Sequence, residues 1–139
     1  SSWLALGAPA DAPAWRVLLR DGRGGYAGAA LLRDTSVSFS ESFGESSEIE
    51  GRRYGHVIDP RSGWPIQEPL AAVALAPDGS TAEALTKALL VLGPREGLAV
   101  LASVPDAEGL MIDTAGSLHQ SPGFQQMTRF EAAAAPVVQ

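Results

Sequence analysis

The sequence contains no cysteine, which excludes disulfide bridges, thiolate metal sites and cysteine nucleophiles but does not fix a cellular compartment. It also has no cluster of lysine and arginine residues, and its net charge of -6 argues against nucleic acid as a main partner. No apolar run approaches the roughly 18 residues of a membrane-spanning helix, and no signal peptide is recognisable. We therefore expect no membrane span within these residues.

What is present is typical of a single globular domain. The 139 residues are 45% apolar and 19% charged. A chain of this size buries about two-thirds of its unfolded surface on folding. We expect one domain over residues 1–130 and a disordered tail at 131–139, where four alanines precede Pro136. Because the chain begins at Ser1 without an initiator methionine, we also expect a segment upstream of it.

Apolar and β-branched residues between turn signals predict seven strands. These strands are 15–20, 26–32, 37–40, 54–58, 71–76, 109–113 and 117–120. The polar, acidic segment 45–51 predicts a surface loop. Strands come first along the chain, followed by helices and a hairpin. This order predicts an α+β fold with a mixed or antiparallel sheet and two helices.

The clearest helix signal begins at Ser80, a predicted N-cap with Glu83 as its capping-box partner. The helix should run to Leu92 and stop at Gly93, and a second helix should run from Pro94 to about Ser103. Apolar residues occupy more than one side of the first helix. A helix of that kind is usually buried between layers, so we expect a partner segment to cover it.

The most informative stretch runs from Arg53 to Gly63, where a β-branched approach enters a tight turn. The turn collects the imidazole of His56, the carboxylate of Asp59 and the guanidinium of Arg61. These groups suit proton transfer and phosphate binding. Structural alternatives stay open for each of them. The histidine can cap a strand end, the aspartate can start the turn, and the arginine can pair with a surface acid.

The order His-x-x-Asp-Pro-Arg-Ser-Gly at residues 56–63 resembles the H-x-x-D-P-R-[TS]-G pattern of the ApbE family, the FAD:protein FMN transferases. Upstream, residues 7–17 resemble the glycine-to-tryptophan stretch of that family. Downstream, residues 82–93 resemble its helix A-D-A-x-x-T-A-L-x-V-L-G. The similarity extends from about residue 3 to about residue 124, and it resembles only the C-terminal half of such a protein.

The resemblance implies transfer of FMN from FAD to a serine or threonine hydroxyl of an acceptor protein, with release of AMP. It implies that His56 activates that hydroxyl with help from Asp59, and that Arg61 and Ser40 contact the FAD. It further implies a missing N-terminal half as partner. A periplasmic or membrane-anchored extracytoplasmic location is suggested by the resemblance alone.

The resemblance also implies a Mg²⁺ site on the helix, and here the sequence departs from the family. Glu83 keeps a carboxylate, but Lys87 replaces a neutral oxygen ligand with an ammonium, which cannot coordinate a cation. The order Glu then Lys at i,i+4 favours an ion pair instead. In the stretch 38–41, Phe39 and Glu41 add bulk and negative charge where the family has small residues. Magnesium binding at Glu83 is therefore in doubt.

Three functions remain open from the sequence. The first is a flavin transferase that is active only when the N-terminal half completes its site. The second is an inactive flavin-binding or protein-interaction module, and the third is an FAD pyrophosphatase with water as acceptor. A metal at Glu83 would favour catalysis, whereas a direct ion pair with Lys87 would favour the module. We also expect His56 and Glu83 to lie at the same end of the domain.

Overall fold

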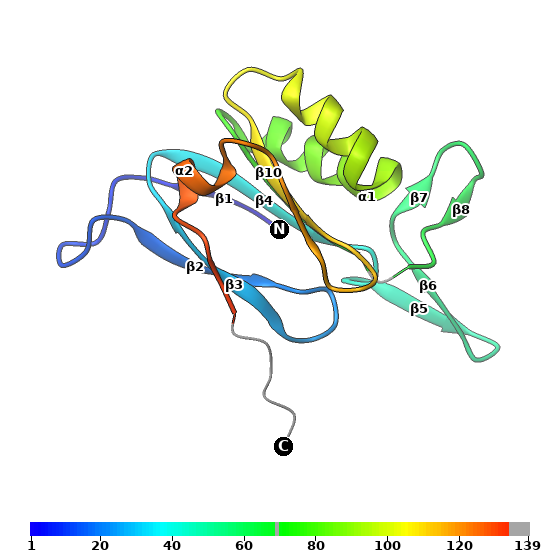
Figure 1. Cartoon of the computed structure of the whole chain (residues 1–139). Coiled ribbons are helices and arrows are strands. Elements are labelled where there is room, and N and C mark those ends of the chain that lie inside the picture. Colours follow the sequence, from blue (N-terminus) through cyan, green and yellow to red (C-terminus); the bar gives the residue numbers. More distant parts are fainter. Residues whose placement is uncertain (69, 134–139) are drawn as a thin grey trace.

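A central five-stranded antiparallel sheet organises the molecule, which we describe from a computed structural model over residues 1–68 and 70–133 (Figure 1). Its strand order is β1-β4-β9-β10-β11. The strands are β1 (Ser2–Ala5), β4 (Thr35–Glu41), β9 (Ala71–Ala76), β10 (Glu108–Ile112) and β11 (Leu118–Gln120). All neighbouring pairs are antiparallel, which confirms the predicted fold class.

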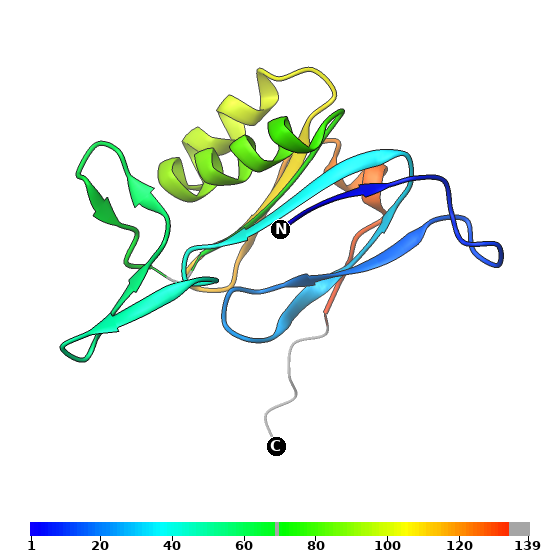
Figure 2. The same cartoon turned by 180° about the vertical axis from the view of Figure 1, so that it is seen from behind.

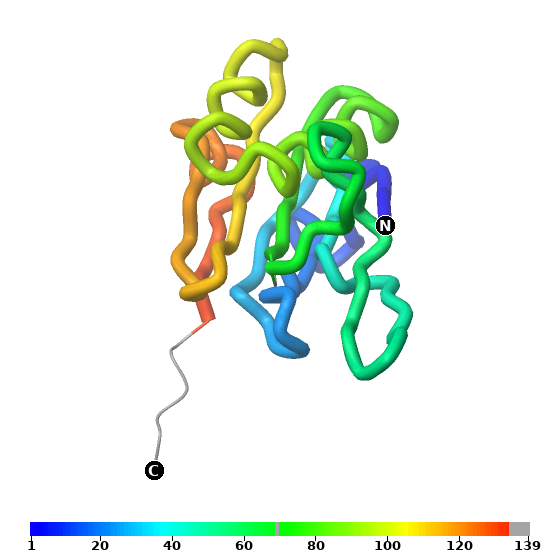
Figure 3. The backbone as a smooth tube through the Cα atoms, turned by 90° about the vertical axis from the view of Figure 1, so that its right-hand side faces the viewer, coloured from blue at the N-terminus to red at the C-terminus, as the bar shows by residue number. Residues whose placement is uncertain are grey.

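The sheet is covered on both faces, so the molecule has three layers (Figures 1 and 3). Helix α1 (Gly79–Ala102) packs on one face against β4, β9 and β10. A smaller sheet of order β12-β3-β2 lies across the other face, as the reverse view in Figure 2 also shows. Its strands are β2 (Trp15–Arg20), β3 (Tyr26–Leu32) and β12 (Glu131–Ala132), and the short helix α2 (Phe124–Thr128) lies beside it.

Strand β9 shows why two cores form. Successive side chains of a strand point to opposite faces. Val73 and Leu75 therefore pack into the core beneath the small sheet, while Ala72 and Ala74 face the helix. The small alanine side chains let α1 approach closely, and Leu89 of the helix is fully buried against them.

Helix α1 joins both predicted helices across a kink at Gly93, where φ is 77° and ψ is 179°. A left-handed φ suits glycine, and Pro94 then restarts the helix as expected. The predicted capping box is wrong. Asp78 is the N-cap, and its side chain accepts a hydrogen bond from the Thr81 amide. Glu83 has tertiary partners instead.

Residues 46–65 project from the main body as two small hairpins, which we call the arm (Figures 1 and 2). The arm contains β5 (Ser46–Ile49), β6 (Arg52–Gly55), β7 (Ile58–Asp59) and β8 (Trp64–Pro65). The predicted loop at 45–51 is therefore wrong, because β5 pairs with β6 there. The predicted strand 54–58 is also interrupted, with His56 and Val57 between two strands.

The predicted disordered tail is wrong at its start. Glu131 and Ala132 pair with Ala29 and Gly28 of β3, and the Ala133 amide donates to the Ala27 carbonyl at 2.7 Å. The rest of the predicted tail, 134–139, lies outside the described residues. Strand β12 therefore forms one edge of the small sheet.

Candidate functional site

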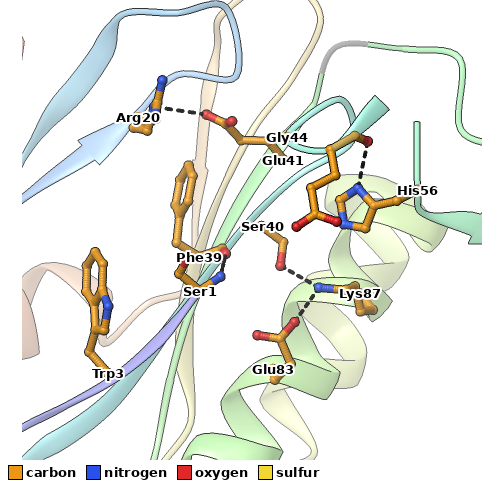
Figure 4. Close-up of a pocket in the computed structure, with 11 residues that line it drawn as sticks. Ser1, Trp3, Arg20, Phe39, Ser40, Glu41, Gly44, His56, Glu83 and Lys87 are labelled. Carbon is orange, nitrogen blue, oxygen red and sulfur yellow. Dashed lines mark hydrogen bonds and ion pairs between the residues drawn. The ribbon is translucent and has the colours of Figure 1, made fainter. Parts of the chain in front are cut away.

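A cavity of about 510 Å³ opens between β4, the arm and α1 (Figure 4). Ser40, His56 and Glu83, three of the predicted site residues, line it together with Lys87. His56 and Glu83 therefore lie at the same end of the domain, as expected. The cavity brings together the His56 imidazole, the Lys87 ammonium, the Arg20 guanidinium and several carboxylates from segments far apart in the sequence.

Strand β4 places its serines on the helix side of the sheet. Val37 and Phe39 pack toward the core beneath the small sheet, so Ser38 and Ser40 between them point toward α1. Both serines are buried. A row of hydroxyls therefore faces the first turns of the helix.

Glu83 and Lys87 meet these serines in one hydrogen-bonded network. Lys87 Nζ donates to Ser40 Oγ at 2.7 Å and to Glu83 Oε1. The second oxygen of Glu83 accepts from Ser38 and, at 2.7 Å, from Ser2. Both oxygens of the carboxylate are thus occupied by donors of the chain itself.

The hydrogen bonds of this network keep the Glu83 carboxyl group ionised. Burial would raise the pKa of this carboxyl, but the hydrogen bonds from Lys87, Ser38 and Ser2 outweigh it and lower the pKa to about 2. Glu83 is consequently ionised at neutral pH, and the Lys87 ammonium lies directly beside it.

These residues do not fit a magnesium ion. Mg²⁺ requires several hard oxygen ligands in octahedral geometry. The only carboxylate in the network is already paired, and an ammonium lies next to it. Within residues 1–68 and 70–133, no group of three or more His, Asp and Glu side chains is arranged to hold a metal. The ion pair expected from the sequence is the arrangement found.

His56 is held by the backbone of the segment before the arm. Its Nδ1 lies 3.0 Å from the carbonyl oxygen of Glu45, and its amide donates to the same oxygen at 3.0 Å. A carbonyl oxygen can only accept, so we assign the proton to Nδ1. Nε2 is then left with a free lone pair, which is the form needed to accept a proton.

Gly55 permits this placement. A Cβ atom at this residue would lie 2.0 Å from the carbonyl oxygen of Ser42. Only a residue without a side chain allows the arm to approach β4 so closely. The close approach of Gly55 to the Ser42 carbonyl therefore allows the backbone to place His56 at the cavity.

Asp59 and Arg61 pair with each other instead of with His56. Arg61 Nη2 lies 2.8 Å from Asp59 Oδ2, and the Arg61 amide donates to Asp59 Oδ1 at 2.9 Å. Hydrogen bonds from Arg61 lower the pKa of Asp59. Arg61 Nη2 also donates to the carbonyl of Val91 at 2.9 Å, so the turn is fastened to α1. Neither residue is part of the cavity lining described above, and their predicted roles in catalysis and cofactor binding stay predictions.

The two bulky departures of the sequence, Phe39 and Glu41, both line the cavity. Arg20 Nε lies 3.6 Å from Glu41 Oε1, so the negative charge of Glu41 is partly offset. Figure 4 shows this pair across the cavity from Glu83 and Lys87. The Phe39 side chain also packs against the core beneath the small sheet.

An apolar groove of about 580 Å³ adjoins the cavity between the arm and α1. Val57, Ile58 and Pro60 form its arm side, and Val91 and Leu92 are among the residues of its helix side. His56 and Lys87 line both the groove and the cavity. Ala88, Val91 and Leu92 of the helix border this groove, whereas Leu90 is buried in the helix-side core.

Several residues that shape the site carry no recognisable sequence signal. Ser2 and Ser38 bind Glu83 across the sheet, and Glu45 acts through its carbonyl oxygen. A backbone carbonyl leaves no mark in side-chain patterns. The period-two spacing of Ser38 and Ser40 in β4 is the one signal that would have placed both on the helix side.

No helix within residues 1–68 and 70–133 is both long enough and apolar enough to cross a bilayer.

A family model and individual relatives among known proteins identify the same family for this chain. A model described as the ApbE family matches residues 1–111. An FAD:protein FMN transferase of Treponema pallidum is 34% identical over 119 residues, which cover 83% of this chain and 33% of the relative. An FAD:protein FMN transferase of Escherichia coli K12 is 36% identical over 98 residues, covering 62% of this chain and 28% of the relative. The chain thus spans about a third of the length of the curated relatives it matches.

Solved structures agree with the sequence comparison. The ApbE protein of Thermotoga maritima superposes with a TM-score of 0.74 at 25% identity, over 87% of this chain and 40% of that one. The apo form of the Pseudomonas stutzeri flavinyl transferase ApbE gives a TM-score of 0.67 at 27% identity, over 91% and 40%.

Proposed function

The chain belongs to the ApbE family, and from that premise we propose that it supplies the C-terminal part of an FAD:protein FMN transferase. The observation that carries the proposal is the position of His56. Its Nε2 is unprotonated in the assigned tautomer and has no hydrogen-bond partner within residues 1–68 and 70–133, and the residue lines the same cavity as the cationic Lys87. A base and a cation in one cavity suit the attack of a hydroxyl on a phosphoryl group.

The proposed step needs no group beyond FAD and the acceptor. The acceptor hydroxyl oxygen attacks the FMN phosphorus, and a new phosphorus–oxygen bond forms. The bond from that phosphorus to the bridging diphosphate oxygen breaks, and AMP leaves. The hydroxyl proton passes to Nε2 of His56, whose Nδ1 is held by the Glu45 carbonyl.

We propose two partners for the chain. The first is an N-terminal segment like that of the longer relatives, which would complete the cavity and cover apolar residues such as Val91 and Leu92. The second is an acceptor protein with a serine or threonine flavinylation site. The periplasmic or membrane-anchored extracytoplasmic location suggested by the family likewise remains a proposal.

One observation favours a second candidate, an inactive flavin-binding or interaction module. Glu83 is paired directly with Lys87, so the carboxylate that the family uses for a metal is not free to bind one. Loss of the metal would remove one source of transition-state charge stabilisation. Binding without chemistry is the expected behaviour of such a module.

Intact-mass analysis separates these functions. The full-length product of the gene would be incubated with FAD and a peptide that carries a family Ser/Thr acceptor motif. We expect the peptide to gain one FMN, and a His56→Ala variant to be about 10²- to 10⁴-fold slower. We expect no FMN gain with the 139-residue chain alone. Bound FAD without any peptide modification would identify the module, and AMP release without an acceptor would identify a pyrophosphatase.

A further inference from the structure

Lys87 is the only lysine in the chain, and it lies where the family resemblance implies a magnesium ion. Its ammonium is fixed by two acceptors, Glu83 Oε1 and Ser40 Oγ. The residues do not fit a metal, as the paired carboxylate shows. The positive charge of the Lys87 ammonium is nevertheless present in the cavity at that place.

The direction of the hydrogen bonds shows how Lys87 is held. Thr86 Oγ1 donates its single hydrogen to the Glu83 carbonyl at 2.8 Å. Ser40, at 2.8 Å from Thr86 Oγ1, must therefore donate to it, and Ser40 Oγ is left to accept from Lys87. Ser40 thus has no hydrogen left for a ligand. It is a positioning residue that aims the ammonium.

An ammonium has three N–H donors. Within the described residues, Lys87 uses two of them, and its side chain is 37% exposed at the cavity. The third donor is available to a ligand. Arg20 and the Ser1 amino group also line the cavity as cations, while Glu41, Glu45 and the paired Glu83 are acids that oppose an anion there.

We propose that Lys87 replaces the divalent cation and binds the diphosphate of the flavin nucleotide directly, so that binding needs no metal. This inference deepens the proposed function and rests on it for the identity of the ligand. The Glu83 carboxylate then has a new role. It holds the ammonium in place, as a metal-binding carboxylate would hold the metal.

A single lysine makes a direct test possible. With ¹³Cε-labelled lysine, the chain gives one side-chain signal, from Lys87. Inorganic diphosphate added in the presence of EDTA should shift this signal in a saturable manner. A signal that does not move with EDTA present would overturn the proposal, as would a shift that requires added Mg²⁺.

Variants test the role of the ammonium through the amide spectrum, which also reports whether each variant is folded. Lys87→Met should weaken diphosphate binding about tenfold or more, because a charged hydrogen bond is lost. Arg33→Met removes the same charge at an exposed site paired with Asp34, and should bind like the parent. Equal weakening in both variants would mean that only net charge matters, and would contradict the proposal.

Magnesium titration provides the opposite test. Mg²⁺ alone should leave the Lys87 signal of the parent unchanged, whereas Lys87→Thr should acquire Mg²⁺-dependent shifts at residues 80–90. Saturable Mg²⁺ binding near Glu83 in the parent would overturn the inference but leave the transfer proposal standing. Diphosphate binding without a metal, combined with no FMN transfer by the full-length protein, would support the role of Lys87 but overturn the transfer proposal.

Discussion

His56 depends on a neighbour that has no side chain. Gly55 lies against the Ser42 carbonyl, and any Cβ there must push the two segments apart. The imidazole itself is held by a single backbone oxygen, that of Glu45. A small displacement of the arm therefore moves the proposed base away from the cavity. The position of the His56 imidazole is therefore set by backbone contacts more than by side-chain partners.

Gly55→Ala should lower FMN transfer strongly, because the methyl group would lie 2.0 Å from the Ser42 oxygen unless the arm moves. Overpacking of this kind typically costs about 1–3 kcal/mol of stability. Transfer by the full-length protein and urea unfolding of the chain measure the two effects. Gly79→Ala is the matched control, since nothing lies within 4 Å of its added Cβ. Equal transfer rates in the two variants would show that Gly55 does not position His56.

Glu83 makes a pH prediction. The folded-state pKa is about 2, below the ordinary value of 4.5. Because the folded state lowers the pKa of this carboxyl, the ionised carboxylate stabilises the fold at pH values above the pKa of the unfolded chain. This stabilisation is lost as the pH falls from about 4.5 toward 2. Glu83→Gln lacks this titration. The difference in unfolding free energy between parent and variant should therefore shrink over that range, as measured by urea denaturation at several pH values. A constant difference would exclude a special role for the ionised carboxylate.

At the scale of elements, sequence patterns succeed where a run of apolar and β-branched residues lies between turn signals. β2, β3 and β9 have the predicted bounds, and the Gly93–Pro94 break falls where expected. β1 and β5 were missed because almost all of their residues are exposed and show no apolar alternation. The capping box failed for a different reason. Asp78 competes with Ser80 as N-cap, and the partners of Glu83 come from distant strands.

The Asp59–Arg61 turn links the arm to helix α1 through a hydrogen bond. Arg61 donates to the Val91 carbonyl close to the α1 kink, where the non-helical backbone of Gly93 interrupts the helix. Arg61→Met should loosen the arm and increase amide hydrogen exchange over residues 52–66, while β9 stays protected. Arg95→Met, at an exposed residue of the same helix, is the control. If amide hydrogen exchange over residues 52–66 is unchanged in Arg61→Met, Arg61 does not hold the arm, and ligand binding becomes the better explanation of this arginine.

At the scale of the whole molecule, two cores on opposite faces of one sheet support the cavity at its edge. The helix-side core decides where Glu83 and Lys87 lie, because α1 rests on the alanines of β9. From the sequence we expected His56 and Glu83 at the same end of the domain, but not the hydrogen bonds of Ser38 and Ser40 that join β4 to α1. Contacts such as Ser2 to Glu83 join residues 81 positions apart, and no local pattern encodes them.

Leu89→Ala tests the helix-side core. Leu89 is fully buried, and its removal should cost about 2–5 kcal/mol of unfolding free energy. Leu6→Ala, at a leucine that is 68% exposed, should cost far less. Urea denaturation of the two variants gives the comparison. Similar losses would mean that α1 is not packed on the sheet as described.

Chemical rescue tests the central claim most directly, namely that His56 accepts the proton of the acceptor hydroxyl. The initial rate of acceptor flavinylation by the full-length protein would be measured for the parent and for His56→Ala, with and without added imidazole. We predict that the variant is about 10²- to 10⁴-fold slower and that imidazole restores part of the rate in the variant but leaves the parent unchanged. A variant as fast as the parent would contradict the account, and so would a slow variant that imidazole does not rescue.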